Sequence, residues 1–584
     1  MTVTDTPSPA LTYGDGGLLR HGRPFRMLSG AVHYFRIHPD QWEDRLRRLA
    51  AMGANTVDTY IPWNFHERVE GTVDFTGWRD AERFIRLAGE VGLDVFVRPS
   101  PYICAEWSNG GIPFWLSGRT RALRTSDPVF LAAVDAWYDE LIPRLAALQA
   151  AHGGPITAIQ IENEYGSFGS DHDYLAHLRD GLRARGMVEL LTTADGTTAD
   201  MVRNGSVDGA MGTFTFGTGV ADAVALRRPG QALLCAELWG GWFDHWGEQH
   251  HVRSAQSMIG TVEELLAEGG SVSLYMAHGG TNFGLWAGAN HDGVLQPTVT
   301  SYDSDAPIGE DGSVNAKFHA LRAAFAPFHP GDLPPVPEAP RRQSAASAPL
   351  SRIASLLDVV RAVPAGEPAP MPLSFEEVGA EDGLVAYEAR ISYEPGTALT
   401  VDVLHDRAVV FLDGVRLGVL ERDGERSLPL PGASGSAVLT LVVESLGRVN
   451  YGPHTGEHKG ILSGVRIGRR FAHGWTHRVL GLDAPSLAGS GDATDGLAEA
   501  AFEVADPADA WLAFPGGVKG LVWLNGFLLG RYWEIGPQRT LYAPAPLWRE
   551  GRNVIRVLDT DRLGSAVEIR EEPDFGPVEE FIGE

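Results

Sequence analysis

Two stretches of the sequence lead an apolar run into a glutamate that has aromatic residues close behind it. Ile156–Asn163 leads into Glu164, and Ala232–Glu237 ends on Glu237. Two facing carboxyl groups can cleave a glycosidic bond, because one protonates the leaving oxygen while the other stays anionic below the anomeric carbon. A single glutamate at a strand end could simply face solvent, but two such ends with aromatic neighbours favour a site. We therefore predict that Glu164 and Glu237 form a carboxylate pair.

Such a pair has physical requirements that its neighbours could meet. Carboxyl groups ~5–5.5 Å apart retain the anomeric configuration, whereas ~6.5–9.5 Å admits a water and inverts it. The acid needs a raised pKa, which poor solvation and nearby negative charge provide. Glu162 precedes Glu164 by two residues, so strand alternation places it on the same face, where it could add charge or contact a hydroxyl. The Asn163 amide could reach a sugar 2-hydroxyl.

Other polar and aromatic residues come directly after the predicted strands and would share the same mouth. This mouth is rich in carboxylate, amide and indole groups and poor in Lys and Arg, so it suits a neutral polyhydroxylated substrate better than a phosphate. The residues are Tyr60, Trp63, Asn64, His66, Glu67, Tyr102, Ala105, Glu106, Trp107, Trp242, Asp244, His245, Trp246, His278, Thr281 and Asn282.

Alternation of apolar runs with helical patterns predicts a (β/α)₈ barrel over residues 1–330. Residues 1–20 are predicted to be an arm. The strand candidates are Met27–Ile37, Asn55–Pro62, Leu93–Pro99, Ile156–Asn163, Glu189–Ala194, Met211–Phe216, Ala232–Glu237 and Ser271–His278. The first helix candidate begins at Pro39. The other five are Asp80–Val91, Pro128–Ala151, Asp171–Arg185, Val252–Glu268 and Asn315–Phe325.

Beyond the barrel the pattern becomes that of an all-β protein. A Pro-rich stretch predicts a linker over residues 331–372, followed by two jelly-roll or sandwich domains at 373–490 and 491–584. Asp406–Gly418 and Val518–Gly530 repeat one hairpin pattern around Asp-Gly and Asn-Gly, which supply the positive φ values of a type I′ turn. The same offset aligns 441–443 with 553–555. Trp511, Trp523, Tyr532 and Trp533 could form a sugar platform, although sandwich core is the commoner role.

Composition excludes several partners. The chain has 584 residues with 48 basic and 75 acidic side chains, a net charge of −27 that disfavours nucleic acid and anionic membranes. Two cysteines, Cys104 and Cys235, lie in apolar runs and do not form a disulfide scaffold, which suits a cytoplasmic protein. No signal peptide or long apolar span is predicted.

Several motifs together resemble the β-galactosidases of glycoside hydrolase family 35, within the clan of retaining (β/α)₈ glycosidases that carry Asn-Glu after strand four. Asn-Glu alone is weakly specific, but the combination is highly specific. The matching stretches are Ser29–Arg36, Thr59–Glu67, Arg98–Trp107, Gly153–Pro155, Gln160–Gly166, Gly240–Gly247, Gly279–Gly284, Thr300–Pro307, Gly530–Trp533 and Gly536–Tyr542.

The resemblance implies a role for each matching residue. It implies Glu164 as acid/base and Glu237 as nucleophile of a retaining exo-β-galactosidase that needs no metal or organic cofactor. It also implies galactose contacts from Tyr60, Ala105 (through its backbone), Glu106, Asn163, Trp242, Tyr275 and Tyr302.

Three positions depart from the family's usual pattern. Ser304 replaces a wall aromatic, Thr215 stands where an acidic or amide residue is common, and Arg68 stands where Pro is usual. The carboxylate pair is untouched, so these departures bear on which sugar and linkage are accepted.

Other chemistries find less support. His245, His250 and His251 with Asp244 match no compact zinc spacing, and there is no G-x-S-x-G motif or phosphate loop. The alternatives that remain are an exo-β-glycosidase for another sugar, such as glucosamine, and a non-catalytic galactoside-binding protein. The β domains could pack on the barrel, pair two subunits as a homodimer, or bind glycan, and the sequence does not choose among these.

Overall fold

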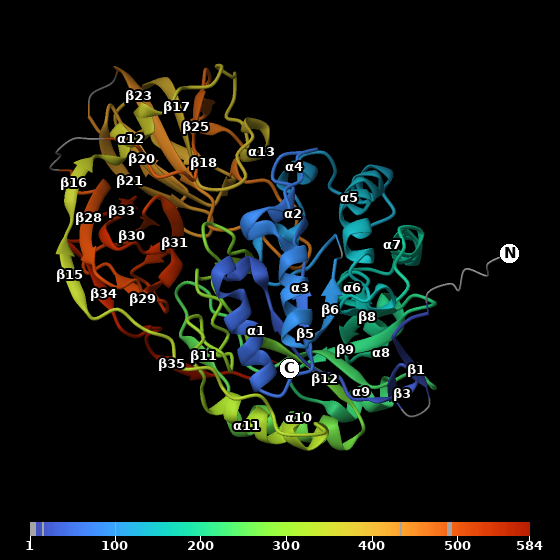
Figure 1. Cartoon of the computed structure of the whole chain (residues 1–584). Helices are drawn as coiled ribbons and strands as arrows, with labels where there is room; N and C mark the ends of the chain where they lie inside the picture. Colours follow the sequence, from blue (N-terminus) through green and yellow to red (C-terminus); the bar gives the residue numbers. More distant parts are fainter. Residues whose placement is uncertain (1–7, 15–16, 100, 433–434, 488–492, 584) are drawn as a thin grey trace.

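The computed structural model describes residues 8–14, 17–99, 101–432, 435–487 and 493–583 (Figure 1). Eight parallel strands close a barrel in the order β10-β12-β4-β5-β6-β7-β8-β9, which confirms the predicted fold class and all eight strand predictions. Their bounds are β4 Leu28–Val32, β5 Thr56–Tyr60, β6 Asp94–Arg98, β7 Ile156–Gln160, β8 Leu190–Gly196, β9 Met211–Phe216, β10 Leu234–Trp239 and β12 Ser271–His278.

The six predicted helices are present, and side-chain caps fix where several of them begin. Asp80, Asp127 and Asp171 each accept a hydrogen bond from a backbone N–H of the first turn, which satisfies a group with no partner inside the helix. Several short helices were not predicted, among them the seven-residue helices α8 and α9 of the barrel. The bounds are α1 Trp42–Ala51, α3 Ala81–Val91, α5 Pro128–Ala146, α7 His172–Ala184, α8 Ala199–Gly205, α9 Val220–Leu226, α10 Ala255–Ala267 and α11 Ala316–Phe325.

The segment predicted as an arm is a small sheet. Strands β1 (Leu11–Gly14), β2 (Gly17–Arg20) and β3 (Arg23–Phe25) pair in antiparallel order. Leu11 and Leu18 are buried against barrel strand residues such as Phe96, so the arm prediction is wrong for residues 11–14 and 17–20. Residues 1–7 lie outside the described part of the chain.

Two β-sandwiches come after the barrel, each with one five-stranded and one four-stranded sheet. In the first sandwich the sheets are β21-β20-β23-β17-β27 and β22-β18-β25-β26, and in the second they are β16-β28-β33-β30-β31 and β15-β34-β29-β32. The first comprises β17 Leu384–Tyr393, β18 Ala398–Val401, β20 Arg407–Leu412, β21 Val415–Glu421, β22 Ser427–Pro429, β23 Gly435–Glu444, β25 Val465–Ile467, β26 Arg470–Phe471 and β27 Thr476–Leu480. The second comprises β15 Ala346–Pro349, β16 Ser351–Ala354, β28 Gly496–Val504, β29 Ala510–Ala513, β30 Lys519–Leu524, β31 Phe527–Trp533, β32 Leu541–Ala543, β33 Gly551–Asp559 and β34 Ala566–Arg570.

The predicted linker contributes two strands to the second sandwich. Strand β15 pairs with β34, and β16 pairs with β28, both in antiparallel register. The chain therefore supplies edge strands to the second sandwich before it builds the first, and the linker prediction is wrong for residues 346–354.

The repeated hairpins form as predicted. Asp413 and Gly414 have φ values of 44° and 83°, and Asn525 and Gly526 have 51° and 92°, so both turns have positive φ at both central residues. Trp511 and Tyr532 are buried in the core of the second sandwich, which confirms the core interpretation for them, whereas Trp523 is buried in an apolar cluster between the two sandwiches.

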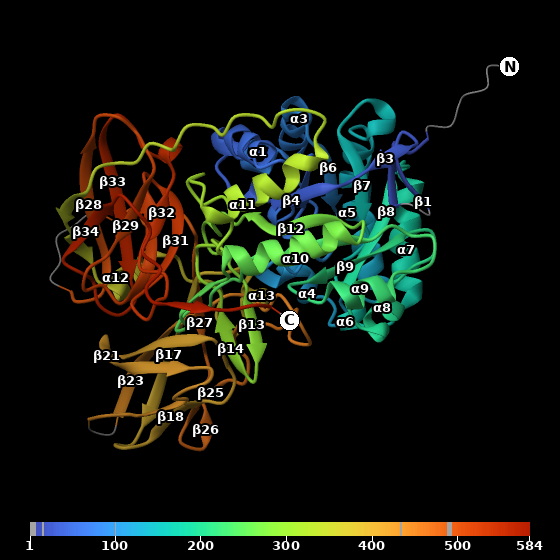
Figure 2. The same cartoon turned by 90° about the horizontal axis from the view of Figure 1, so that it is seen from below.

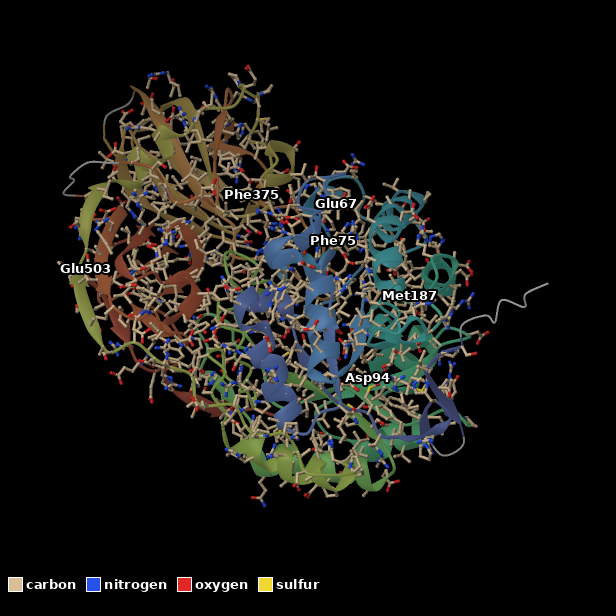
Figure 3. The ribbon with its side chains drawn as sticks, viewed as in Figure 1. Glu67, Phe75, Asp94, Met187, Phe375 and Glu503 are labelled. Atoms are coloured by element: carbon tan, nitrogen blue, oxygen red, sulfur yellow. The ribbon has the colours of Figure 1, made fainter. Side chains whose placement is uncertain are left out.

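The three domains pack against one another (Figures 1 and 2), and side chains fill the interior of each (Figure 3). One apolar cluster joins the two five-stranded sheets through Phe411 on β20 and Trp523 on β30. The barrel residue Phe283 belongs to the core of the second sandwich. The β domains thus pack on the barrel, the first of the three arrangements that the sequence leaves open. Within the described residues, no helix combines the length and apolar character needed to span a membrane.

Candidate active site

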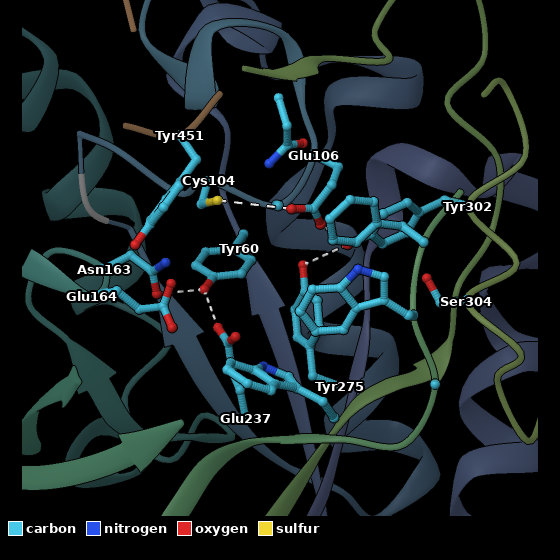
Figure 4. Close-up of a pocket in the computed structure, with 16 residues that line it drawn as sticks. Tyr60, Cys104, Glu106, Asn163, Glu164, Glu237, Tyr275, Tyr302, Ser304 and Tyr451 are labelled. Carbon is cyan, nitrogen blue, oxygen red and sulfur yellow. Dashed lines mark hydrogen bonds between the residues drawn. The ribbon is translucent and has the colours of Figure 1, made fainter. Parts of the chain in front are cut away.

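A cavity of about 260 Å³ opens at the C-terminal ends of the barrel strands (Figure 4). All nine residues predicted from the sequence to be catalytic or substrate-binding line this cavity, although they come from distant parts of the chain. The lining residues are Tyr60, Cys104, Ala105, Glu106, Asn163, Glu164, Glu237, Trp239, Gly241, Trp242, Phe243, Tyr275, Asn290, Tyr302, Ser304 and Tyr451.

Glu237 lies on β10 and is held by two donors from strands β5 and β6, which are not adjacent to β10 in the barrel. The Tyr60 hydroxyl and the Arg98 guanidinium each lie 2.5 Å from its Oε1. Arg98 is fully buried and also pairs with Asp58, so its charge is shared between two carboxylates. Both hydrogen bonds that Glu237 accepts from described residues end on Oε1, which leaves Oε2 without a bound donor among them. Arg98 belongs to one of the matching motifs but was not predicted as a site residue.

Glu164 comes after β7 at the start of a one-turn helix, α6 (Tyr165–Phe168). Its φ is 47°, in the left-handed region that is costly for a residue with a side chain. Its backbone N–H donates to Ala194 O at 3.0 Å, and the Thr215 hydroxyl donates to its Oε1 at 2.7 Å. Burial and the charge of Glu237 raise the pKa of Glu164 to about 7, which suits a proton donor near neutral pH.

Glu162 does not face the cavity, so the prediction for it is wrong. It is fully buried and accepts two hydrogen bonds from Arg124, at 2.9 and 2.8 Å, and one from Tyr174. Strand alternation fails here because β7 ends at Gln160 and the φ of Glu162 is 56°. Its carboxylate instead accepts the Asn163 N–H at 2.6 Å and so positions the backbone beside Glu164.

The Asn163 side chain contacts Tyr60, which in turn contacts Glu237. The Asn163 Oδ1 lies 2.7 Å from the Tyr60 hydroxyl and 3.0 Å from Gln160 Nε2. Tyr60 has a single hydroxyl proton, so it can donate to Asn163 or to Glu237 but not to both at once. When Tyr60 donates to Asn163, this hydrogen bond fixes the orientation of the Asn163 amide, and its Nδ2 remains available to a ligand.

A second group of polar residues lies across the cavity from Glu164 in the view of Figure 4. Cys104, Ala105 and Glu106 all have positive φ, which turns the loop after β6 into the cavity. Glu106 accepts a hydrogen bond from the Tyr302 hydroxyl, and burial raises its pKa. The Tyr302 hydroxyl also lies 3.2 Å from that of Tyr275. This cluster offers an acceptor and two hydroxyl groups to a polyhydroxylated ligand.

The guanidinium of Arg36 supports this wall from outside the cavity. It lies 3.6 Å from the centre of the Tyr302 ring and donates to the Ala105 carbonyl.

The other twelve residues of the predicted mouth do not line the cavity, which is lined from that set by Tyr60, Ala105, Glu106 and Trp242. The Trp107 indole N–H donates to Asn64 Oδ1 at 2.9 Å, and the Trp63 indole N–H donates to Glu67 Oε2 at 2.6 Å. His250 lies 2.7 Å from Asp244 through Nδ1, in a short strand beside the rim.

The three residues that depart from the usual family pattern differ in how closely they approach the carboxylate pair. Thr215 donates a hydrogen bond to Glu164, so the expectation that the departures leave the carboxylate pair untouched is wrong for this residue, and Ser304 lines the cavity. Arg68 lies outside it and forms a 2.8 Å ion pair with Glu381, which connects the barrel to the segment before β17.

Several lining residues were not predicted. Trp239, Gly241 and Phe243 flank predicted residues and belong to the same strand end, so the sequence held a usable signal for them. Tyr451 comes from the first sandwich and Asn290 from strand β13 (Ala289–Asp292). Neither has a local pattern that would place it in a barrel mouth.

Comparison with known proteins gives the family of this barrel. The family model of Glycosyl hydrolases family 35 matches residues 17–328, more than half of the chain. The chain belongs to this family. It is therefore a glycoside hydrolase. Two further models match this family 35 hydrolase: "Beta-galactosidase, first all-beta domain" over residues 372–481 and "Beta-galactosidase, galactose-binding domain" over residues 497–553.

Curated relatives of the family 35 hydrolase span nearly all of it. The beta-galactosidase of Bos taurus is 37% identical, covering 91% of this chain and 87% of the relative. That of Macaca fascicularis is 38% identical, covering 94% and 86%. That of Homo sapiens is 37% identical, covering 94% and 87%.

Proposed function

We propose that this family 35 hydrolase is a retaining exo-β-galactosidase that removes terminal β-D-galactosyl residues. The observation that carries the proposal is that Glu164 and Glu237 line one cavity and that the charge of Glu237 helps to raise the pKa of Glu164 to about 7. One carboxyl can thus hold a proton near neutral pH while the other is paired with Arg98. The names of the relatives point to the same substrate.

The first step forms a covalent intermediate. Glu237 Oε2 attacks the anomeric carbon while Glu164 gives its proton to the glycosidic oxygen, so the C–O bond breaks and the aglycone leaves as an alcohol. The galactose becomes esterified to Glu237, which loses its negative charge.

The second step reverses the roles. With Glu237 neutralised, the main charge raising the pKa of Glu164 is gone, so its carboxylate can act as a base. Glu164 takes a proton from water, the water oxygen attacks the anomeric carbon, and the ester bond to Glu237 breaks. Two inversions give retention, and each carboxyl returns to its starting state.

Proton NMR during hydrolysis of a nitrophenyl β-galactoside tests this mechanism. We expect β-galactose to appear first and to mutarotate later. An initial α-anomer would mean inversion, and no hydrolysis would favour the galactoside-binding alternative.

A panel of aryl β-glycosides tests the sugar. We expect kcat/KM to be highest for galactose among epimeric and amino sugars. A higher value for glucosamine would replace galactose in the proposal.

A further inference from the structure

The last described residues of the chain return from the second sandwich to the barrel mouth (Figure 2). After β34, strand β35 (Val578–Glu580) pairs in parallel with β11 (His250–Val252) beside the active site. His250 N donates to Pro577 O at 2.9 Å, and Phe581 N donates to Val252 O at 2.8 Å. We call residues 577–583 the returning segment.

The returning segment contacts two indoles that line the cavity, Trp239 and Trp242. The ring of Phe581 lies 5.2 Å from that of Trp242, measured between centroids. Gly583 is buried, and a Cβ added to it would lie 2.5 Å from Trp242 Cζ3 and 3.0 Å from Trp239 Cε3. On another side, a Cβ added to Gly217 would lie 2.1 Å from the Gly583 carbonyl oxygen. The Gly583 backbone therefore fills the space behind both indoles.

Space, rather than backbone conformation, requires glycine at position 583. Its φ lies outside the left-handed region, so an alanine could adopt the same backbone. The added methyl group would have to displace the Trp242 ring, because 2.5 Å is far below van der Waals contact.

The returning segment does not line the cavity, so any effect it has on a ligand must pass through the indoles. Trp239 and Trp242 are only partly buried, and packing on their outer side limits the rotamers they can reach. We propose that Phe581 and Gly583 are positioning residues that fix Trp239 and Trp242, and that they thereby set the affinity of the cavity for the sugar. This inference rests on the proposed function.

The central test compares Gly583→Ala with Ile582→Ala, a matched control whose side chain is exposed. An indole that contacts the sugar equally in the ground and transition states changes KM without changing kcat. We expect Gly583→Ala to raise KM and the galactose inhibition constant at least about fivefold, with kcat within about twofold and Tm equal to that of the control. Identical KM and inhibition constants in the two variants would overturn the inference.

A double-mutant cycle with Trp242→Phe identifies the route of the effect. Phenylalanine lacks the second ring that carries Cζ3, so it removes the closest contact that the new methyl group would make. We expect Gly583→Ala to raise KM less than about 1.5-fold in the Trp242→Phe background. If the KM of the double variant equals the product of the two single fold-changes, Gly583 does not act through Trp242.

Two controls keep the outcomes distinct. If Gly583→Ala fails to fold, Phe581→Ala removes the ring contact and should raise KM about two- to threefold; an unchanged KM there would contradict the inference. If the unsubstituted protein does not hydrolyse the galactoside, the proposed function fails. If it does and the variants behave like the control, only the inference about positioning fails.

Discussion

The pKa of Glu164 is set by influences with opposing effects. Burial and Glu237 raise its pKa, whereas the hydrogen bond from Thr215 lowers it by stabilising the ionised form. Thr215 occupies a position where the family usually has an acidic or amide residue, so this chain has placed a neutral donor against the acid. If Glu164 is the acid, as proposed, this departure bears on proton transfer as well as on the shape of the site.

Glu164→Gln tests the acid role through the leaving group. Glutamine cannot donate a proton to the glycosidic oxygen, and only poor leaving groups need that proton. We expect kcat/KM to fall at least about 10²-fold for an alkyl galactoside, on the order of general acid catalysis, and much less for a dinitrophenyl galactoside. Steady-state kinetics on galactosides with a series of aglycones measures how the loss in kcat/KM depends on the leaving group. An equal loss across the series would contradict the assignment of Glu164 as the acid.

The pH profile tests the balance at Thr215. If protonated Glu164 is the active form, as proposed, kcat/KM should fall as the pH rises through a pKa of about 7. Thr215→Val removes the hydrogen bond that favours the carboxylate, so the alkaline limb should move to higher pH. Thr213→Val on the same strand is the control, since its hydroxyl bonds the Thr193 carbonyl and not Glu164. If the alkaline limb of the Thr215→Val profile does not move, Thr215 does not influence the pKa of Glu164.

At the scale of single elements, the barrel strands were predictable because each is an apolar run bounded by helical patterns. The backbone beyond a strand end was harder to predict. Strand alternation placed Glu162 in the cavity, yet the backbone leaves the strand after Gln160 and takes positive φ at Glu162 and Glu164. The loss of strand geometry at these two residues has no signature in the apolar pattern, which ends before them.

The repeat predicted the hairpins correctly but not the register of the strand that pairs with each. Val410 pairs with Leu441, and the repeat aligns these two residues with Val522 and Asn553. Val522 pairs instead with Val557, four residues beyond Asn553. An even shift preserves the buried face of a strand, so the alternation of apolar residues could not reveal it.

The buried pair of Arg124 and Glu162 is predicted to stabilise the turn that carries Glu164. Arg124→Met leaves a buried carboxylate unpaired, which should lower the free energy of unfolding by ~3–5 kcal/mol. Adding Glu162→Gln removes the charge and should restore most of the loss. Urea unfolding of both variants measures this difference. A double variant no more stable than the single one would mean that the pair is not what stabilises the turn.

At the scale of the whole molecule, contacts between domains complete the active site. Tyr451 of the first sandwich lines the cavity, and the neighbouring Asn450 carbonyl accepts a hydrogen bond from Tyr102 at 2.6 Å. Strands β15 and β16 pair with strands of the second sandwich that lie far later in the chain. Such pairings depend on partners distant in sequence, which is why local patterns predicted the domains but missed these residues. Cytoplasmic location and a homodimer stay predictions.

Phe283 tests whether the barrel and the second sandwich unfold together. It is buried in the sandwich core, where its ring lies 5.4 Å from Trp78 and 5.7 Å from Phe527. Phe283→Ala should cost ~3–5 kcal/mol of stability, typical of a deleted buried ring. Because the lost contacts join two domains, we expect calorimetry to show the single transition of the unsubstituted protein separating into two.

The control for this substitution is Phe471→Ala, which removes an exposed ring on β26 and should leave a single transition at an unchanged temperature. If Phe283→Ala lowers the transition temperature without dividing the transition, other contacts keep the two domains coupled. The shared apolar cluster between the two five-stranded sheets would be the next interface to weaken, since it joins the second sandwich to the first. If the transition of Phe283→Ala does divide, loss of activity at the temperature of the first transition would show that the barrel mouth depends on the β domains that pack against it.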